Sequence, residues 1–394
     1  MTPVDTARWL LAGVMVGMLF SPPAAVLLEL ALYAVMLGSA DCRARLARAV
    51  REPLPAMVLA FWLVVGLGLL YSIAPWRESV AIWLGWRRLL LLVFAFALFD
   101  ETAWKARLAC ILVAVATAGA LASYASALAN FSFRYYETGI VFRNHVTQSM
   151  VFALAAFAAV LLLKDGVARS PTQRIALATA ALLLSSNVVF VTTGRSGYAA
   201  LLVVSLVAAY TWRGAASHLQ RLGVTVFIAL IVAGALASSP IVQQRVGRGL
   251  DEIRNYERGS EVSAMGERVV FLRNTVELVL ERPLFGYGTG AFRTAYAAKV
   301  EGRPGREGIR SEDPHNAYLS IVVQHGVLGL LVFLSVLACA LRAPASGLYR
   351  LLALGALAAW CVTSLFTGMF SIFAEGRLIW LWLGVCLARE RGPA

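Results

Sequence analysis

Charged residues are scarce in this sequence, since Asp, Glu, Lys and Arg make up only 14% of its 394 residues. The chain is 60% hydrophobic, and its mean hydropathy of +0.74 excludes a soluble globular protein. Lys and Arg still exceed Asp and Glu by 35 to 22. Nucleic-acid binders carry their basic residues on a soluble surface, so this excess favours membrane lipid phosphates as partners and not nucleic acid. The composition predicts a polytopic membrane protein.

Several catalytic signatures are also missing. The sequence contains no DxD, GxSxG, HExxH or GxxxxGK[ST] pattern, and its acidic residues show no metal-ligand spacing. The five cysteines have no CxxC spacing, and four of them fall in apolar runs, which predicts neither a disulfide framework nor a metal site. We therefore expect no metal and no cofactor.

Long apolar runs separated by turn residues or charges predict an all-α fold with about twelve transmembrane helices. We expect residues 1–239 to hold nine of these helices, 240–316 to form an outer loop with short helices, and 317–394 to hold the last three. The first run lacks a small-residue cleavage site, so we interpret it as a retained helix. The expected helix cores are 9–20, 24–37, 56–71, 80–99, 108–128, 147–163, 175–191, 198–212, 224–237, 317–341, 351–370 and 378–387.

The short loops alternate in their content of Arg and Lys. One set carries clusters such as Arg43, Arg45, Arg48 and Arg51, while the opposite set is poorer in positive charge. By the positive-inside rule the richer loops are cytoplasmic, which places both termini inside and the loop 240–316 outside.

The outer loop contains one expected helix, residues 261–281, with Val269, Leu272, Val276 and Leu280 at helical spacing. A glycine-rich stretch follows at 286–290. A phosphate-cradling loop is one interpretation of this stretch, but the absence of the Walker pattern favours a plain turn.

The outer loop ends in Asp313-Pro314-His315-Asn316, directly before a long apolar run. Asp313 predicts a helix N-cap and Pro314 the first helical residue, so we expect His315 in the first turn of a membrane helix, at the water boundary. The positive end of the helix dipole disfavours imidazolium, so a neutral His315 could accept a proton as a general base. On position alone, a polar turn that merely marks the end of the helix is the alternative.

Arginines at three places are candidates for binding an anion. Arg195 lies at the outer end of a span, Arg268 lies in the outer loop, and Arg87-Arg88 interrupts the fourth span, with Glu29 as the expected partner. Arginine near hydrocarbon is costly and usually functional or paired, although snorkelling, interface anchoring or a solvated helix charge would also explain them singly. Several arginine forks converging at an outer pocket would suit a diphosphate.

Two further histidines, His145 and His325, lie near the ends or within the expected spans. His145 begins an outer helix end and is a second-rank site candidate. His325 lies about three turns beyond His315, and we interpret it as a packing or hydrogen-bonding residue.

The stretch Pro314-His315-Asn316-Ala317-Tyr318-Leu319, followed by Gly326-Val327-Leu328-Gly329-Leu330, resembles the signature of the O-antigen ligase and polymerase superfamily. Supporting elements are the Thr-Gly-Arg-Ser-Gly turn around Arg195, Arg268 before a helix, and the stretch 282–288 that contains Tyr287. The resemblance extends from about the fourth span to the end and is closest to the WaaL-type O-antigen ligases. His325 departs from the pattern, because many relatives have an acidic residue there.

This resemblance implies a GT-C-type membrane glycosyltransferase of the bacterial inner membrane with a periplasmic active site. His315, Arg195 and Arg268 match the key residues of such enzymes, with Arg88 and Arg143 as further diphosphate ligands. The implied reaction transfers O-antigen polysaccharide from undecaprenyl diphosphate to lipid A-core oligosaccharide, without metal and with inversion. Second-rank candidates are Arg87, His145, Asn316, Tyr287 and His325.

Two other functions stay open. A Wzy-type polymerase would use another lipid-linked repeat as its acceptor. A transporter of anionic lipid-linked glycans would also need arginines in a membrane cavity, but it should show broken helices in corresponding halves and a site at the midplane.

Overall fold

The computed structural model describes residues 1–133, 137–211, 217–244, 246–247, 264–345 and 347–390, apart from the side chains of 264–268 and 306. These residues form helices and turns and contain no strand. The first half holds α1 (Pro3–Phe20), α2 (Pro22–Gly38), α3 (Ala40–Ala49), α4 (Pro53–Leu67), α5 (Trp76–Gly85), η1 (Trp86–Leu89), α6 (Leu90–Leu98), α7 (Thr102–Leu128), α8 (His145–Lys164), α9 (Pro171–Phe190), α10 (Arg195–Tyr210) and α11 (His218–Ser238). The second half holds α13 (Ala264–Glu281), α14 (Phe292–Val300), η2 (Gly305–Gly308), α15 (Ala317–Arg342), α16 (Gly347–Thr363) and α17 (Phe373–Leu387).

Each expected apolar run overlaps a helix, although α4 and α16 end before the runs 56–71 and 351–370 do, and the count of twelve spans is not confirmed. Among the described residues, seven helices are long and apolar enough to cross a membrane, or eight if the bent pair α2 and α3 is one span. Helices α4, α10, α16 and α17 have 15 to 17 residues, and such a length rises only about 22–26 Å against a hydrocarbon core of roughly 30 Å. The protein is therefore a polytopic helical membrane protein with several short apolar helices.

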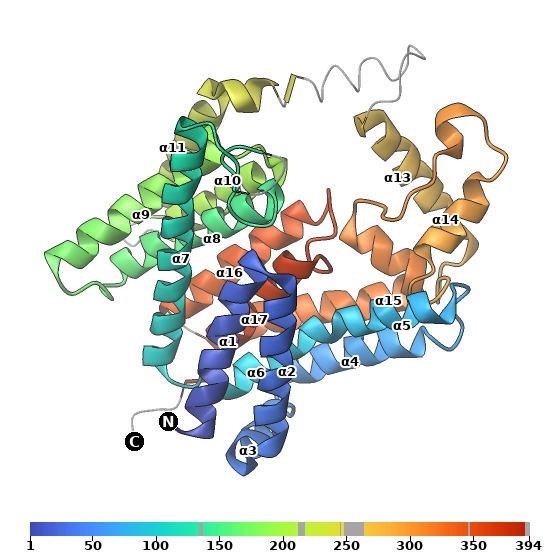
Figure 1. Ribbon diagram of the computed structural model, residues 1–394, viewed down its shortest axis with the longest axis horizontal. Helices are drawn as coiled ribbons and strands as arrows, with labels where there is room; N and C mark the ends of the chain where they lie inside the picture. The colour runs from blue at the N-terminus through green and yellow to red at the C-terminus, as the bar shows by residue number, and fades with distance from the viewer. Residues whose placement is uncertain (134–136, 212–216, 245, 248–263, 346, 391–394) are drawn as a thin grey trace.

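Helix α17 lies at the centre of the bundle, among α1, α6, α8 and α16 (Figure 1). Its side chains are almost completely buried, including Trp380 and Trp382. Two of the residues buried with them are charged, Glu375 and Arg377. The central helix thus carries charge into the interior, where charge is costly unless it is paired.

Two expected spans are interrupted. The fourth, expected as a continuous helix, is split into α5, the 3-10 turn η1 and α6, and η1 contains Arg87 and Arg88. The tenth, α15, is broken at Gly326, which has φ +65 and ψ −172. A Cβ at Gly326 would lie 2.0 Å from the Leu284 carbonyl oxygen, so the close approach of this loop requires glycine.

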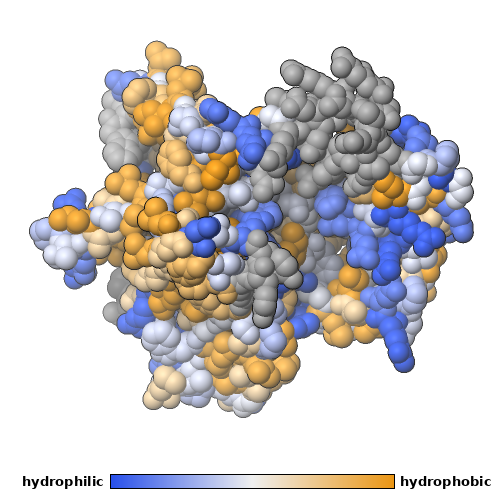
Figure 2. Space-filling view, turned by 45° about the horizontal axis from the view of Figure 1, so that its top comes forward, coloured by the Kyte–Doolittle hydropathy of each residue, from blue (hydrophilic) through white to orange (hydrophobic). Residues whose placement is uncertain are grey.

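The outer loop contributes a second, smaller core between α13, α14 and α15. It is formed by Phe271, Leu278, Tyr287, Phe292 and Tyr296, with Val323 of α15. The expected helix 261–281 is present as α13 from Ala264, and the start of the prediction lies outside the described residues. Hydrophilic side chains gather at the end of the molecule that holds α13 and α14, whereas hydrophobic ones dominate much of the remaining surface in that view (Figure 2).

Candidate functional site

The sequence predicted His315 in the first turn of α15, and the structure contradicts this prediction. The helix begins at Ala317, and Asn316 is its N-cap, whose side-chain oxygen accepts hydrogen bonds from the backbone N–H groups of Tyr318 and Leu319. Asp313 instead accepts from the N–H of His315 at 2.9 Å. Asparagine and aspartate both cap well, but only Asn316 has its amide oxygen within reach of two free N–H groups here. The prediction placed the cap three residues too early.

The backbone of His315 is left-handed, with φ +53. This region is sparsely populated by residues with a Cβ, although His is among the types enriched there. The imidazole stacks on the ring of Phe271 of α13, at a centroid distance of 6.2 Å. Arg268 lies three residues before Phe271 on the same helix. Arg268 therefore lies on the helix whose Phe271 contacts His315.

A cavity of about 510 Å³ lies beside this segment, between α5, η1, α14 and the start of α15. Asp313, two residues before His315, lines it together with Arg88 of η1. Arg293 and Glu312 form an ion pair across it at 3.5 Å. Neither Arg143 nor Arg195 is among the residues that line it. The cavity is therefore lined both by Arg88, one of the predicted arginines, and by the segment that precedes His315, the predicted base.

The loop between α16 and α17 connects Arg88 to the His315 segment. Arg88 donates from Nη1 to the carbonyls of Ser371 and Ile372, the latter at 2.7 Å, and from Nε to Gly85 at 2.6 Å. The same loop accepts a hydrogen bond from the Asn316 side chain at Leu365. Two of the three guanidinium nitrogens thus donate to backbone carbonyls, and no hydrogen bond from Nη2 is found among the described residues.

Glu29 is completely buried and does pair with Arg87, as predicted, at 3.5 Å. Its shorter contact is with Arg377 of α17, which donates from Nε at 2.6 Å and from Nη2 at 3.2 Å. This bidentate pair is the stronger geometry. The expectation that Arg87 or Arg88 would be the partner was incomplete, because no local sequence pattern indicates that α17 packs beside α2.

Arg143 and Arg377 both stack on Phe373, with the guanidinium carbons 4.7 Å and 3.9 Å from the ring centroid. Nη1 of Arg143 and Oε2 of buried Glu375 have no hydrogen-bond partner among the described residues. The other carboxylate oxygen of Glu375 accepts from Thr147 at 2.6 Å. We refer to the buried residues Glu29, Glu375 and Arg377, together with the half-buried Arg87, Arg88 and Arg143, as the buried cluster.

Arg195 and His145 form a separate group where α10 and α8 begin. A Cβ at Gly194 would lie 2.8 Å from the His145 carbonyl oxygen, and one at Gly197 would lie 2.1 Å from Cβ of Ser149. The two glycines of the Thr-Gly-Arg-Ser-Gly turn therefore allow the first turns of the two helices to touch. Arg195 is exposed, and the Nδ1 atom of His145 lies 3.8 Å from Glu137.

The glycine-rich stretch 286–290 is a packing loop and cannot cradle a phosphate with its amides. The N–H groups of Tyr287 and Gly288 donate to the carbonyls of Val323 and Gln324, next to the break in α15. The N–H groups of Thr289 and Gly290 donate to the Gly68 carbonyl and the Gln324 side chain. Every donor that a phosphate would need is already used.

The side chain of Tyr287 is held by its neighbours in the outer loop. Its hydroxyl donates to Glu281 at 2.5 Å, and Arg282 stacks on its ring. Burial, and then the hydrogen bond to Glu281, raise the pKa of Tyr287 to about 12. A phenol with this pKa stays protonated and does not serve as a base near neutral pH.

His325 is buried, and Nδ1 has no hydrogen-bond partner among the described residues. The ring lies against Gly68, where an added Cβ would approach it to 3.1 Å. His325 therefore packs against Gly68, as a packing residue would, and no hydrogen bond from Nδ1 is found among the described residues.

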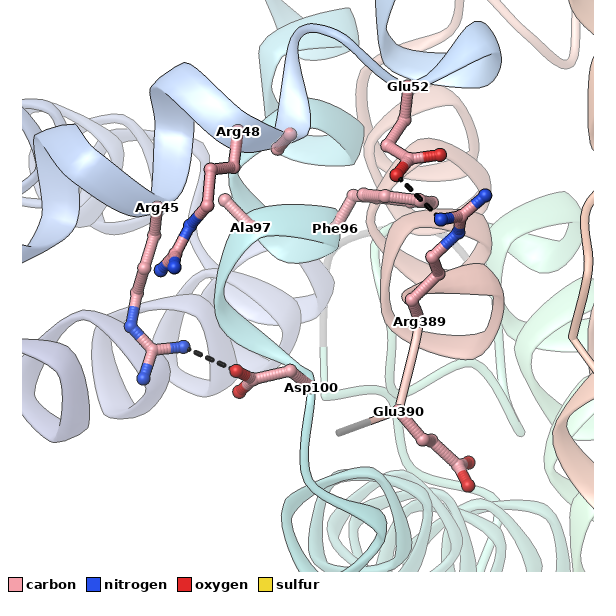
Figure 3. A pocket seen from close by; sticks show the side chains of 9 residues that line it. Arg45, Arg48, Glu52, Phe96, Ala97, Asp100, Arg389 and Glu390 are labelled. Carbon is pink, nitrogen blue, oxygen red and sulfur yellow. Dashed lines mark hydrogen bonds and ion pairs between the residues drawn. The ribbon is translucent and has the colours of Figure 1, made fainter. Parts of the chain in front are cut away.

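A second polar pocket, of about 200 Å³, lies at the other end of the molecule, between α3, the end of α6 and the residues after α17 (Figure 3). Arg45 bonds Asp100 at 2.7 Å, and Arg389 pairs with Glu52 at 3.1 Å. None of the predicted site residues lines this pocket. Its arginines are mostly neutralised, so it is a weaker candidate for a diphosphate site.

Glu375 and Arg377 were missed as site candidates. The available signal was an acidic and a basic residue two positions apart at the start of the last apolar run, where charge is expensive unless it is paired. Phe271, which contacts His315, and Arg293, which lines the cavity, could not have been found in this way, because no sequence pattern marks them.

Residues 180–334 match the family model described as O-antigen ligase. The match confirms the resemblance over this stretch, which contains Arg195, Arg268, Tyr287, His315, Asn316 and His325. It does not extend to Arg87, Arg88, Arg143 or His145. No curated protein matches the chain.

Proposed function

We propose that the protein is an O-antigen ligase of the bacterial inner membrane, which joins O-antigen polysaccharide from undecaprenyl diphosphate to lipid A-core oligosaccharide at the periplasmic face. The observation that carries this proposal is the geometry of His315. A left-handed non-glycine residue costs on the order of 1–3 kcal/mol and persists only where its surroundings fix it, as they do at active sites. Here Asp313, Asn316 and Phe271 fix it beside a cavity that contains Arg88.

In the proposed reaction, His315 takes the proton from an acceptor hydroxyl while its oxygen attacks the anomeric carbon of the donor sugar. The bond from that carbon to the diphosphate oxygen breaks, and undecaprenyl diphosphate leaves with the electron pair. A single displacement of this kind inverts the configuration. Arg195 and Arg268, with Arg88 and Arg143, would stabilise the charge that develops on the diphosphate. These arginines supply the positive charge for which other enzymes use a metal ion.

An apolar cavity supports a lipid-linked donor. It has a volume of about 1000 Å³, lies between α10, α11, α15 and α16, and is lined mostly by aliphatic side chains. Tyr318 contributes to its wall and is three residues from His315. A polyprenyl chain placed there would have its diphosphate end near the first turn of α15.

The test uses two variants of His315 in a transfer assay with purified protein, lipid-linked glycan and lipid A-core. His315→Gly suits φ +53 and removes the backbone strain, so a purely structural turn would tolerate it well. His315→Gln keeps a hydrogen-bonding side chain but cannot accept the proton. If His315 is the base, both lose about 100-fold to 10,000-fold in rate, while His315→Gly unfolds no earlier than the unmodified protein.

Near-normal transfer by either variant would return His315 to a structural role. The same assay separates the ligase from a polymerase. Product on lipid A-core supports the ligase, whereas elongation of the lipid-linked glycan without acceptor contradicts it.

A further inference from the structure

The apolar stripe of α13 is not part of the protein core. Its four residues are between 43% and 74% exposed: Val269, Leu272, Val276 and Leu280. The helix instead buries Phe271, Asn274, Thr275 and Leu278 against α14 and α15. A regular apolar stripe on the outside of an otherwise packed helix marks an interaction surface.

The stripe continues into the membrane-facing surface of α15. After α13 ends, Leu284 and Phe285 are exposed as well, at 59% and 61%. Their loop is fixed at the break of α15, because the N–H of Val327 donates to the Pro283 carbonyl at 2.7 Å. Val327, Leu328 and Leu331 of α15 are exposed apolar residues of a predicted span. One continuous apolar surface therefore runs from the span onto α13.

Two helix lengths give the depth of this loop. From Gly326 to Arg342, α15 rises about 24 Å, and α4 rises about 22 Å over its 15 residues. Helix α4 ends beside Gly68, whose carbonyl accepts from Thr289 at 3.0 Å. With Arg342 and Pro53 taken to lie at the opposite boundary of a hydrocarbon core of roughly 30 Å, both lengths place the loop about 5–10 Å below the boundary on the His315 side.

The other flank of α13 carries charged side chains that form ion pairs with α14 and the residues after it. Lys299 of α14 bonds Glu277 and Glu281 of α13 at 3.0 Å and 2.6 Å, and Arg303 contacts Glu277 at 3.4 Å. We refer to these four residues as the outer network. An apolar stripe on one flank and a charged network on the other is the pattern of a helix lying in a membrane interface.

We propose that α13 lies in the headgroup and acyl-chain boundary of the leaflet on the His315 side, with Val269, Leu272, Val276 and Leu280 in contact with lipid acyl chains. Lipid is favoured over a protein partner because the stripe is continuous with a surface that already faces hydrocarbon. This docking would fix the height of α13, and with it the backbone of Arg268 and the ring of Phe271, relative to His315. The proposal does not depend on the chemistry assigned to the site.

The experiment measures the surroundings of single spin labels in lipid nanodiscs. Labels are attached to cysteines introduced at Leu272, Val276 and Leu280, in a background in which Cys110, Cys339 and Cys361 are alanine. Arg273, on the same helix and well exposed, is the matched control position. Elution as a single species in size exclusion shows that each labelled variant is folded.

We expect the three stripe labels to collide more with oxygen, which concentrates in lipid, than with a water-soluble nickel chelate. The label at Arg273 should show the reverse. Stripe labels that the nickel chelate reaches as readily as the control would overturn the proposal. Labels shielded from both reagents would also overturn it, because they would be covered by protein.

A photoreactive benzoylphenylalanine at Val276 gives a second readout in the same nanodiscs. Crosslinks to lipid are expected. A crosslinked dimer of the chain, formed in place of lipid adducts, would assign the stripe to a second copy and contradict the proposal.

Discussion

The buried cluster and the outer network contain the same kinds of side chain but place them in different solvents. Glu29 of the cluster has no exposed surface, whereas about a third to a half of each glutamate side chain in the outer network is exposed. A buried charge that loses its partner keeps the full cost of desolvation, while an exposed one regains water. The cluster should therefore hold α2, η1 and α17 together, and the outer network should add little.

The largest effect is expected from Glu29→Gln, which leaves Arg377 and Arg87 without their carboxylate. Breaking a buried pair from one side typically costs about 3–5 kcal/mol. We expect a clear loss of thermal stability and of folded yield, measured by fluorescence-detected size exclusion after heating. The double variant Glu29→Met with Arg377→Met removes both charges and should recover much of the loss. If Glu29→Gln were as stable as the unmodified protein, the buried cluster would not stabilise the fold more than the outer network does.

The next effect concerns Arg88, which belongs to the buried cluster and also reaches the cavity. Arg88→Lys keeps the charge but cannot hold the carbonyls of Gly85 and Ile372 with a planar fork. Each charge-assisted hydrogen bond lost costs about 1.5–3 kcal/mol, and transfer activity should fall with stability. Arg87→Lys is the comparison, since Arg87 contacts Glu29 at 3.5 Å and donates to one carbonyl, that of Leu84, at 3.0 Å. Equal tolerance of both substitutions would argue against a special position for Arg88.

A small effect is expected from Glu277→Gln in the outer network. This change removes the pairs with Lys299 and Arg303, and exposed pairs typically contribute about 0.2–1 kcal/mol. The heating assay used for Glu29→Gln should show a shift near its detection limit, and added salt should reduce it further. A loss as large as that of Glu29→Gln would mean that the outer network is desolvated, for example by lipid.

The smallest effect is the acid response of the same network. The hydrogen bond from Lys299 is the main cause that lowers the pKa of both Glu277 and Glu281 below the ordinary value of 4.5. A carboxyl group whose pKa is lowered by folding stabilises the fold above its unfolded pKa, and this contribution is lost as the pH falls through its folded pKa. Stability should thus be unaffected by these groups between pH 7 and 5 and decline below pH 4.5.

Lys299→Met should flatten that part of the profile. Melting temperatures of the two proteins, measured in the same buffers from pH 6 to pH 3, provide the comparison. Parallel curves would show that the lysine does not stabilise the carboxylates.

Much of the fold was predictable because apolar runs and turn residues act locally. Each expected helix core overlaps a helix, and α1 and α2 are joined by a tight turn at Ser21, which ends α1 and caps α2. The number of twelve spans stays a prediction, because α4, α10, α16 and α17 are apolar but only 15 to 17 residues long. The break of α15 at Gly326 was missed, because it depends on the close approach of the distant Leu284 segment.

The candidate site was predictable in its residue types and less so in its arrangement. The motif around His315 was recognised from six consecutive residues, yet the cap was assigned to Asp313 and not to Asn316. Both are good capping residues in sequence, and the choice depends on where Ala317 is held by the Ser364 carbonyl. Arg88 stays a predicted site residue, and its anchoring by the loop between α16 and α17 is seen only in the packed helices.

The sequence by itself determined the membrane class, the helices and the residues that could act as a base or bind phosphate, since these follow from local hydropathy and side-chain chemistry. Only the tertiary structure decided that Glu29 pairs chiefly with Arg377, 348 residues away, and that the stripe of α13 points away from the core. Pairing across such separations depends on how the helices align in space. That alignment results from the packing of the whole bundle, and no local pattern in the sequence specifies it.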